Sequence, residues 1–311
     1  MALILLPLVL SLVAWLLPSA QTRLFGLIAS ALSLAWSIVA VCYFKPTDHL
    51  LVDFGLRFIR FSIDSLGFTM ILLTNAVFFL VFLSQFTSNI TQEKRFTALA
   101  LLMQFGLVGV FTTNTILGFY IFWELTLLPI FLILYWFGSF EKPRALLQCF
   151  LYTLLGSLAM LLAVIGLMHA TNQQTYEGLL VADLNVLGNT STLLMGGFLF
   201  AFAVKIPLFP FHTWQPSTYH MNSTPGTMLL SGIMLKMGVF GVIRWLLPVV
   251  PLGCEQWGDT AIFLAMLGIV YASFIAIVQK DFKKLLAYSS IAHVGLITAG
   301  VMTGTADGLR G

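Results

Sequence analysis

The chain has 311 residues, of which 59% are hydrophobic and only 9% are charged, with a formal net charge of +3. Soluble globular domains carry about 25% charged residues, so this composition excludes an ordinary soluble protein and indicates a polytopic membrane protein.

A helix that crosses a bilayer needs about 20 apolar residues, and on this criterion the chain is all-α with about ten transmembrane helices. In chain order, the expected spans lie near residues 2–18, 23–44, 64–87, 96–113, 115–137, 144–170, 191–214, 221–248, 259–279 and 285–304. The first span opens directly with ALILLPLVLSLVAWLLP and no basic residue precedes it, which predicts a retained helix and not a cleaved signal peptide.

Two segments between the spans are polar. Residues 45–60 contain three basic and two acidic residues without a clean apolar run, and we expect an extramembrane hairpin or a short amphipathic segment there. Residues 171–190 are expected to form a polar loop. The three cysteines, Cys42, Cys149 and Cys254, are far apart and indicate neither a metal site nor a disulfide framework.

The distribution of basic residues predicts the orientation, because cytoplasmic loops are enriched in lysine and arginine. With the amino terminus outside, the outer loops contain only Lys45, Arg57 and Arg60 as clear basic residues. The inner loops then contain Arg23, Lys94, Arg95, Lys142, Arg144, Lys280, Lys283 and Lys284. The amino terminus is therefore expected on the outer side.

Three ionisable residues lie deep in apolar spans: Glu124, Lys205 and Lys236. A charged side chain at the centre of a membrane helix costs about 2.5–3.5 kcal/mol on insertion scales, so such residues are usually functional. Glu124 and one lysine could instead form a fixed ion pair that only orders the helices. The other lysine would then have no carboxylate, and a lysine kept from water releases its proton more readily, as a proton carrier must. Both interpretations stay open.

The stretch FAVKIPLFPFHTW from Phe202 to Trp214 predicts an interrupted helix, because Pro207 and Pro210 cannot donate backbone hydrogen bonds. Discontinuous helices at membrane depth often build ion sites, although an ordinary proline kink would have the same spacing. Three histidines, at positions 212, 220 and 293, are candidates either for proton relay or for packing.

Four motifs together resemble the antiporter-like, proton-pumping membrane subunits of respiratory complex I. They are FWELTLLPIFLILYWFG, FAVKIPLFPFHTWQP, LLSGIMLKMGVFGVIRW and QKDFKKLLAYSSIAHVG. The WELTLLP form is most similar to the chain M, or subunit 4, type. The resemblance covers about residues 64–300 and implies a polar chain across the membrane, made by Glu124, Lys205 and Lys236. His293 is a further candidate relay because histidine titrates near neutrality.

The resemblance also implies a domain organisation. Residues 1–92 form an amino-terminal three-helix region, residues 93–250 a complete five-helix repeat with the broken helix, and residues 251–311 the first two helices of an incomplete, inverted second repeat. Family members have about fourteen helices, so this chain is expected to be truncated at its carboxyl end, or to be completed by another polypeptide. The sequence HTWQPSTYH departs from the family pattern at Ser217 and Tyr219, and we assign no relay role to this loop.

The predicted function is proton translocation within NADH:quinone oxidoreductase, with the chain as a subunit of that enzyme. The chain lacks a dinucleotide fingerprint and a cysteine cluster, so no cofactor or metal is expected on it. NADH, FMN, iron–sulfur clusters and quinone would belong to partner subunits. The partners are other complex I membrane subunits, including antiporter-like ones, together with lipid and protons but no nucleic acid, in an energy-transducing membrane such as the bacterial plasma membrane. A multisubunit cation/proton antiporter, a membrane-bound hydrogenase and a purely structural membrane subunit remain alternatives.

Overall fold

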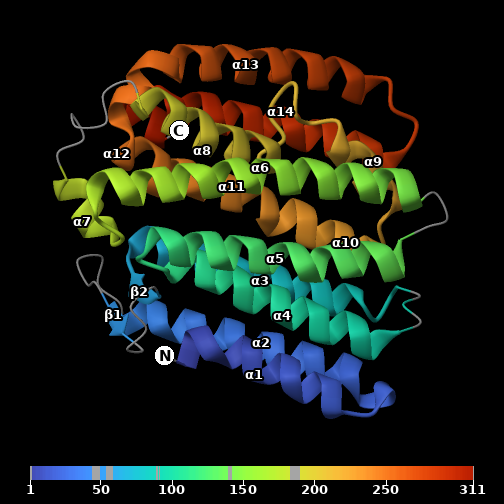
Figure 1. The fold of residues 1–311 in the computed structure, drawn as a ribbon. Helices are drawn as coiled ribbons and strands as arrows, with labels where there is room; N and C mark the ends of the chain where they lie inside the picture. Colours follow the sequence, from blue (N-terminus) through green and yellow to red (C-terminus); the bar gives the residue numbers. More distant parts are fainter. Residues whose placement is uncertain are drawn as a thin grey trace. The chain divides into compact units, whose positions relative to one another are not determined.

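The structure is a computed structural model that describes residues 2–43, 50–53, 59–88, 90, 92–138, 142–182 and 190–310. It is almost entirely helical (Figure 1). Within the described residues, eight helices are long and apolar enough to cross a membrane, and two shorter apolar helices lie at Ile4–Leu16 and Thr190–Lys205. The predicted all-α membrane fold is therefore confirmed.

The chain divides into two compact units. The first contains residues 1–142 and 222–233, and the second contains residues 143–221 and 234–311. The predicted domain boundaries at 92/93 and 250/251 follow internal repeats and not compactness, so they stay predictions.

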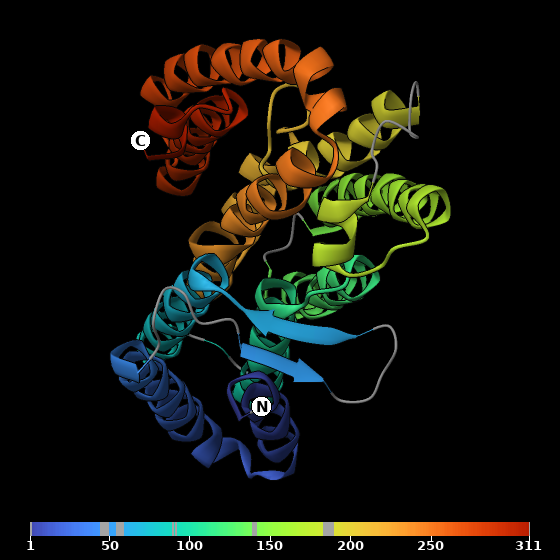
Figure 2. The same ribbon diagram turned by 90° about the vertical axis from the view of Figure 1, so that its left-hand side faces the viewer.

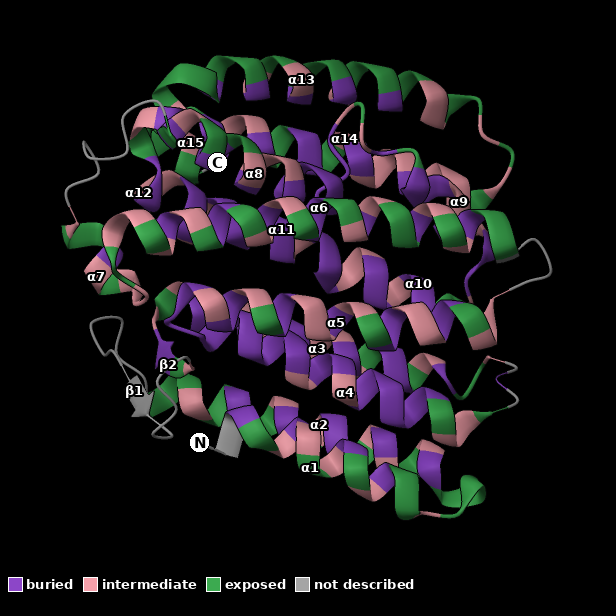
Figure 3. Ribbon diagram, viewed as in Figure 1, coloured by how far each residue is buried: buried purple, intermediate pink, exposed green. Residues whose placement is uncertain are grey.

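The first unit is built around one central helix. Its long helices are α1 (Ala2–Leu16), α2 (Ser19–Tyr43), α3 (Ser65–Ser84), α4 (Glu93–Thr112) and α5 (Ile116–Phe137). Helix α4 contacts the other four, and Figure 3 shows it mostly in the colour of buried residues. The short helix α10 (Thr224–Leu229) packs on α3 and α5. Beyond its charged first turn, α4 has no exposed residue, which fits its central position.

A small β-hairpin lies at one end of these helices (Figures 1 and 2). Strand β1 (Leu50–Asp53) pairs antiparallel with β2 (Arg60–Ile63), with Leu50 opposite Ile63. Helix α3 follows directly, and the carboxylate of its N-cap, Asp64, accepts a hydrogen bond from the Gly67 N–H at 2.7 Å. The segment expected as a hairpin or amphipathic stretch thus contains a hairpin. Its residues 44–49 and 54–58 lie outside the described part of the chain.

The second unit contains α6 (Lys142–Thr171), α7 (Tyr176–Val181), α8 (Thr190–Lys205) and α9 (Trp214–Met221). After the π-helical turn η2 (Leu230–Met234), the chain continues as α11 (Leu235–Gly241), the π-helical turn η3 (Val242–Leu246) and α12 (Leu247–Val249). It ends with α13 (Pro251–Ile277), α14 (Phe282–Met302) and α15 (Ala306–Arg310). Helices α13 and α14 pack together, α8 contacts α11 and α13, and α9 contacts α14.

Two predicted boundaries are wrong for identifiable reasons. The loop expected at 171–190 contains α7, because Thr175 caps this helix through the Gly178 N–H and Leu179 is fully buried. Residues 183–189 of that loop lie outside the described part. Helix α13 begins at Pro251, eight residues before the predicted start at 259. The polar residues in its first turns are exposed, so the helix begins before its apolar part.

Gly109 allows α4 and α5 to approach each other closely, because a Cβ atom at this position would overlap the ring of Phe122. We expect Gly109→Ala to lower the free energy of unfolding by about 1–3 kcal/mol, the usual cost of overpacking. Gly196→Ala in α8 is the matched control, since nothing lies within 4 Å of a Cβ there. The control should not destabilise the chain, because alanine is more favourable than glycine within a helix by about 1 kcal/mol. Thermal unfolding of the purified chain in detergent measures both, and equal shifts would contradict this packing argument.

Candidate functional site

The candidate site in the second unit is centred on Lys205, the last residue of α8, whose side chain is 2% exposed. The three residues before it are also buried. Cys149 of α6 lies near Lys205, and Thr218 of α9 lies near Cys149. Three helices therefore contribute to the surroundings of this lysine.

Helix α8 ends at Lys205 because Pro207 cannot supply the next backbone hydrogen bond. In a continuous helix, the residue at position 207 would donate to the Ala203 carbonyl, and Leu208 would donate to the Val204 carbonyl. Here the Leu208 N–H donates to the Ala203 carbonyl instead, at 2.8 Å. The Val204 carbonyl accepts a hydrogen bond from the indole Nε1–H of Trp214, at 3.0 Å.

Trp214 therefore replaces the helical donor that the interruption removes. It is buried, and it is the first residue of α9, where the chain becomes helical again. An unsatisfied carbonyl in a bilayer costs several kcal/mol, so the interruption can persist beside Lys205 because a side chain satisfies it.

We expect Trp214→Phe to lower the free energy of unfolding by about 1–3 kcal/mol, because the Val204 carbonyl would lose its donor while the aromatic bulk remains. Trp257→Phe is the matched control, because Trp257 lies on α13 and is 46% exposed. Thermal unfolding of each purified variant measures the difference. If Trp257→Phe lowers the free energy of unfolding as much as Trp214→Phe does, the indole hydrogen bond to Val204 does not contribute to stability.

Lys236 is brought close to this site. It is a half-buried residue of α11, and α11 packs against α8. A Cβ atom on Gly238 would lie 3.3 Å from the Cβ of Lys205, so the two lysine-bearing helices touch at the level of the lysines. The π-helical turns η2 and η3 directly precede and follow α11. Such turns are rare in proteins and are frequently found at functional sites.

Glu124 belongs to the first unit, on α5, and is half-buried. Trp123 beside it is buried, and Tyr120 lies one helical turn earlier. Helix α5 continues through Pro129 to Phe137. No proline precedes Glu124 in α5, and the helix is continuous up to this residue. Glu124 therefore lies within a regular helix, whereas Lys205 is the last residue of one.

The histidines occupy three different environments. His212 is buried in the interrupted segment, with its ring stacked on Phe209 and edge-on to Tyr271, at centroid distances of 5.7 and 5.1 Å. His293 is exposed on α14, and its Nδ1 lies 2.7 Å from the Ser289 carbonyl oxygen. The role of His293 as a relay remains a prediction.

His220 contacts Asp281 and thereby joins the end of α9 to the start of α14, with 3.1 Å between Nδ1 and Oδ2. This contact is an ion pair when the imidazole is protonated. Asp281 is also the N-cap of α14, and its other carboxylate oxygen accepts a hydrogen bond from the Lys284 N–H at 2.9 Å. This backbone hydrogen bond, and then the contact with His220, hold the pKa of Asp281 below its usual value. At the start of α9, the Gln215 amide donates to the Ser290 hydroxyl at 3.1 Å. These contacts hold the second part of the broken helix on α14.

Sequence reasoning did not identify Trp214, Asp281 or the π-helical turns. Asp281 had a local signal, because an aspartate just before an apolar helix is a typical N-cap. The hydrogen bond of Trp214 to Val204 spans a non-helical turn and has no sequence signature. Among the described residues, no group of three or more His, Cys, Asp and Glu side chains could hold a metal ion.

The fold and the site define an integral membrane protein in which a discontinuous helix ends at a buried lysine. The chain belongs to the NADH:quinone oxidoreductase/Mrp antiporter transmembrane family, whose pattern matches residues 113–311.

The chain is similar to NADH-quinone oxidoreductase subunit M of Rickettsia typhi, with 32% identity over 92% of this chain and 60% of that protein. It is also similar to a chain in respiratory complex I from Thermus thermophilus, with 32% identity and a TM-score of 0.88, over 99% of this chain and 65% of that one. A chain of an archaeal membrane-bound sulfane sulfur reductase has 25% identity and the same TM-score, over 97% of this chain and 64% of that one. The chain thus spans about 60% of the length of these proteins.

Proposed function

We propose that this chain is a proton-translocating membrane subunit of an NADH:quinone oxidoreductase, in which protons enter from the inner side and pass by way of Lys205 to Lys236. The observation that supports it best is Lys205 itself, 2% exposed at the end of a helix interrupted within an apolar chain. Holding a charge in such a position costs free energy, and a group that gains and loses a proton there can use the position for transport. Contact between α8 and α11 gives the proton a second lysine to reach.

Glu124 is proposed to stabilise the protonated form of Lys205, following the family pattern. Weakening of this interaction would favour release of the lysine proton towards Lys236. Lysine suits this role because its ammonium group can release a proton, whereas the guanidinium group of arginine does not do so in proteins.

Redox chemistry is proposed to lie on partner subunits of the complex, which would hold NADH, FMN, iron–sulfur clusters and quinone. Neighbouring antiporter-like subunits would share the membrane with this chain. The proposed location is an energy-transducing membrane, such as the bacterial plasma membrane, since the similar proteins from Rickettsia typhi and Thermus thermophilus are bacterial.

Lys205→Met keeps much of the side-chain volume and removes the titratable group. In assembled complexes reconstituted into vesicles, we expect proton pumping to fall by about 10²-fold or more, the usual contribution of a positioned proton-transfer group. Lys205→Arg keeps the positive charge and should fail as well. Lys283→Met, near the first turn of α14, is the control and should pump normally. Full pumping by assembled Lys205→Met complexes would rule out the relay.

The structural alternative predicts a different result for a double variant. If Glu124 and Lys205 are only a fixed ion pair, Glu124→Gln combined with Lys205→Met should be milder than either single change, because no isolated buried charge remains. Under our proposal the double variant assembles at least as well as the single variants but does not pump. A double-mutant cycle measures both quantities, the amount of complex and the proton uptake at matched complex content. Recovery of both together would make the pair architectural.

A second candidate is a subunit of a cation/proton antiporter or of another respiratory membrane complex. The chain of the sulfane sulfur reductase has the same TM-score to this protein as the complex I chain has, and this equal similarity supports the second candidate. Purification of the complex with its partners separates the two candidates. Quinone-site and iron–sulfur subunits would support complex I, and small antiporter subunits would support the alternative.

A further inference from the structure

A cavity of about 570 Å³ lies in the first unit, at the turn between α1 and α2 and the start of α4. The residues that line it include Trp15, Ser19, Gln92, Glu93, Lys94 and Arg95. Its mouth is accessible, because Gln92 and Arg95 are exposed and Trp15 is 44% exposed. The proton path proposed above does not involve it.

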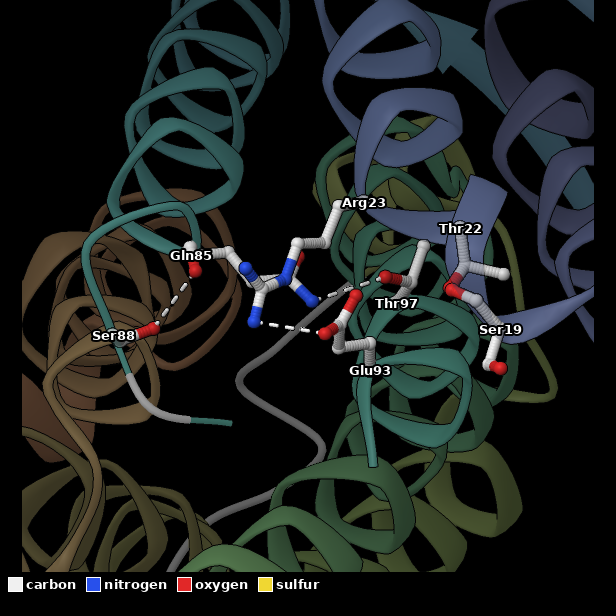
Figure 4. Close-up of polar contacts among 7 residues, drawn as sticks. All are labelled: Ser19, Thr22, Arg23, Gln85, Ser88, Glu93 and Thr97. Atoms are coloured by element: carbon white, nitrogen blue, oxygen red, sulfur yellow. Dashed lines mark hydrogen bonds and ion pairs between the residues drawn. The ribbon is translucent and has the colours of Figure 1, made fainter. Parts of the chain in front are cut away.

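The charge around the cavity is positive. Glu93 is the only acidic side chain in its described lining, and Figure 4 shows its carboxylate facing the guanidinium of Arg23, at 2.8 Å. This ion pair neutralises Glu93 and connects the start of α4 to α2. Counting Arg23 with the lining, three positive side chains and one negative side chain leave a net charge of +2. The cavity therefore suits an anion.

The neighbouring contacts hold both this ion pair and Arg95 in place. Gln85, at the end of α3, donates to the Thr97 hydroxyl at 3.4 Å beside the Arg23–Glu93 pair, as Figure 4 shows. Arg95 donates one hydrogen bond to Gln92, at 2.7 Å, and its guanidinium lies 5.0 Å from the centre of the Trp136 ring. A guanidinium has five N–H donors, so a preoriented group that uses one for Gln92 has donors for a phosphate.

The surroundings indicate the membrane–water interface. Tryptophan side chains concentrate at this level of a bilayer, and Trp15 and Trp136 both lie near the cavity residues. Next to Trp15, Leu12 and Leu16 of α1 are 60% and 84% exposed. An anion with apolar chains could place its charged group in the cavity and its chains along this face. Basic pockets between membrane helices typically bind lipid headgroups.

We propose that this cavity binds the headgroup phosphate of an anionic phospholipid, through Lys94 and Arg95. The net positive charge favours an anionic lipid over a zwitterionic one, and the exposed leucines favour a lipid over free phosphate. By the distribution of basic residues, the lipid would belong to the inner leaflet.

Native mass spectrometry of the full chain in mild detergent tests this site, with dioleoylphosphatidylglycerol and dioleoylphosphatidylcholine as probes. We expect the first phosphatidylglycerol to bind more tightly than phosphatidylcholine, and its affinity to fall as the salt concentration rises. Lys94→Gln with Arg95→Gln should weaken phosphatidylglycerol binding about 10- to 30-fold, from the contribution of two basic groups near a membrane surface. Phosphatidylcholine binding should stay unchanged.

Two further variants control this experiment. Lys283→Gln with Lys284→Gln removes an equivalent basic pair from the first turn of α14 and should leave binding within about twofold. Lys94→Arg with Arg95→Lys keeps both charges and should keep the preference for phosphatidylglycerol, so a loss caused only by misfolding is recognised. Equal binding of the two lipids, or an equal loss in the α14 control, would overturn the proposal. Displacement of the lipid by inorganic phosphate alone at millimolar concentration would assign the cavity to free anions and overturn its lipid part.

Discussion

The second unit depends on how the chain satisfies its backbone between Lys205 and Trp214. A bilayer offers no water to a freed carbonyl, so a broken helix at membrane depth needs internal donors. Leu208 and Trp214 supply them, to the carbonyls of Ala203 and Val204. The interruption is thus a defined structure, in which Lys205 ends one helix while its neighbours on α6 and α9 remain fixed.

The interruption also depends on where α9 lies, because α9 supplies the Trp214 donor. Because α9 supplies the Trp214 indole, it has to be held firmly, and the contacts of Gln215 with Ser290 and of His220 with Asp281 attach it to α14. A chain of contacts therefore leads from the carbonyl beside Lys205 to the N-terminal turn of α14.

The first unit uses uncharged polar contacts at membrane depth. The Gln104 amide donates to the Asn75 carbonyl oxygen at 2.8 Å, and the Asn75 amide donates to the Ser33 backbone carbonyl at 3.2 Å. These three buried residues connect α4, α3 and α2. Polar side chains that satisfy one another join membrane helices without the cost of a buried charge. The ion pair between Arg23 and Glu93 in the same unit lies at the ends of α2 and α4.

The sequence by itself determined the membrane class, the order and approximate limits of the long helices, and the candidate residues Glu124, Lys205 and Lys236. Apolar length and isolated charges are local properties, and a bilayer penalises both short spans and buried charges strongly. Pro207 likewise ended α8 locally, since a proline lacks the backbone N–H. Only the tertiary structure decided that the Trp214 indole donates a hydrogen bond to the Val204 carbonyl and that His220 contacts Asp281. It also decided that α11, with a π-helical turn before and after it, packs beside Lys205. These contacts join residues that are not sequence neighbours, and their partners depend on helix packing, which one-dimensional patterns of hydrophobicity do not specify.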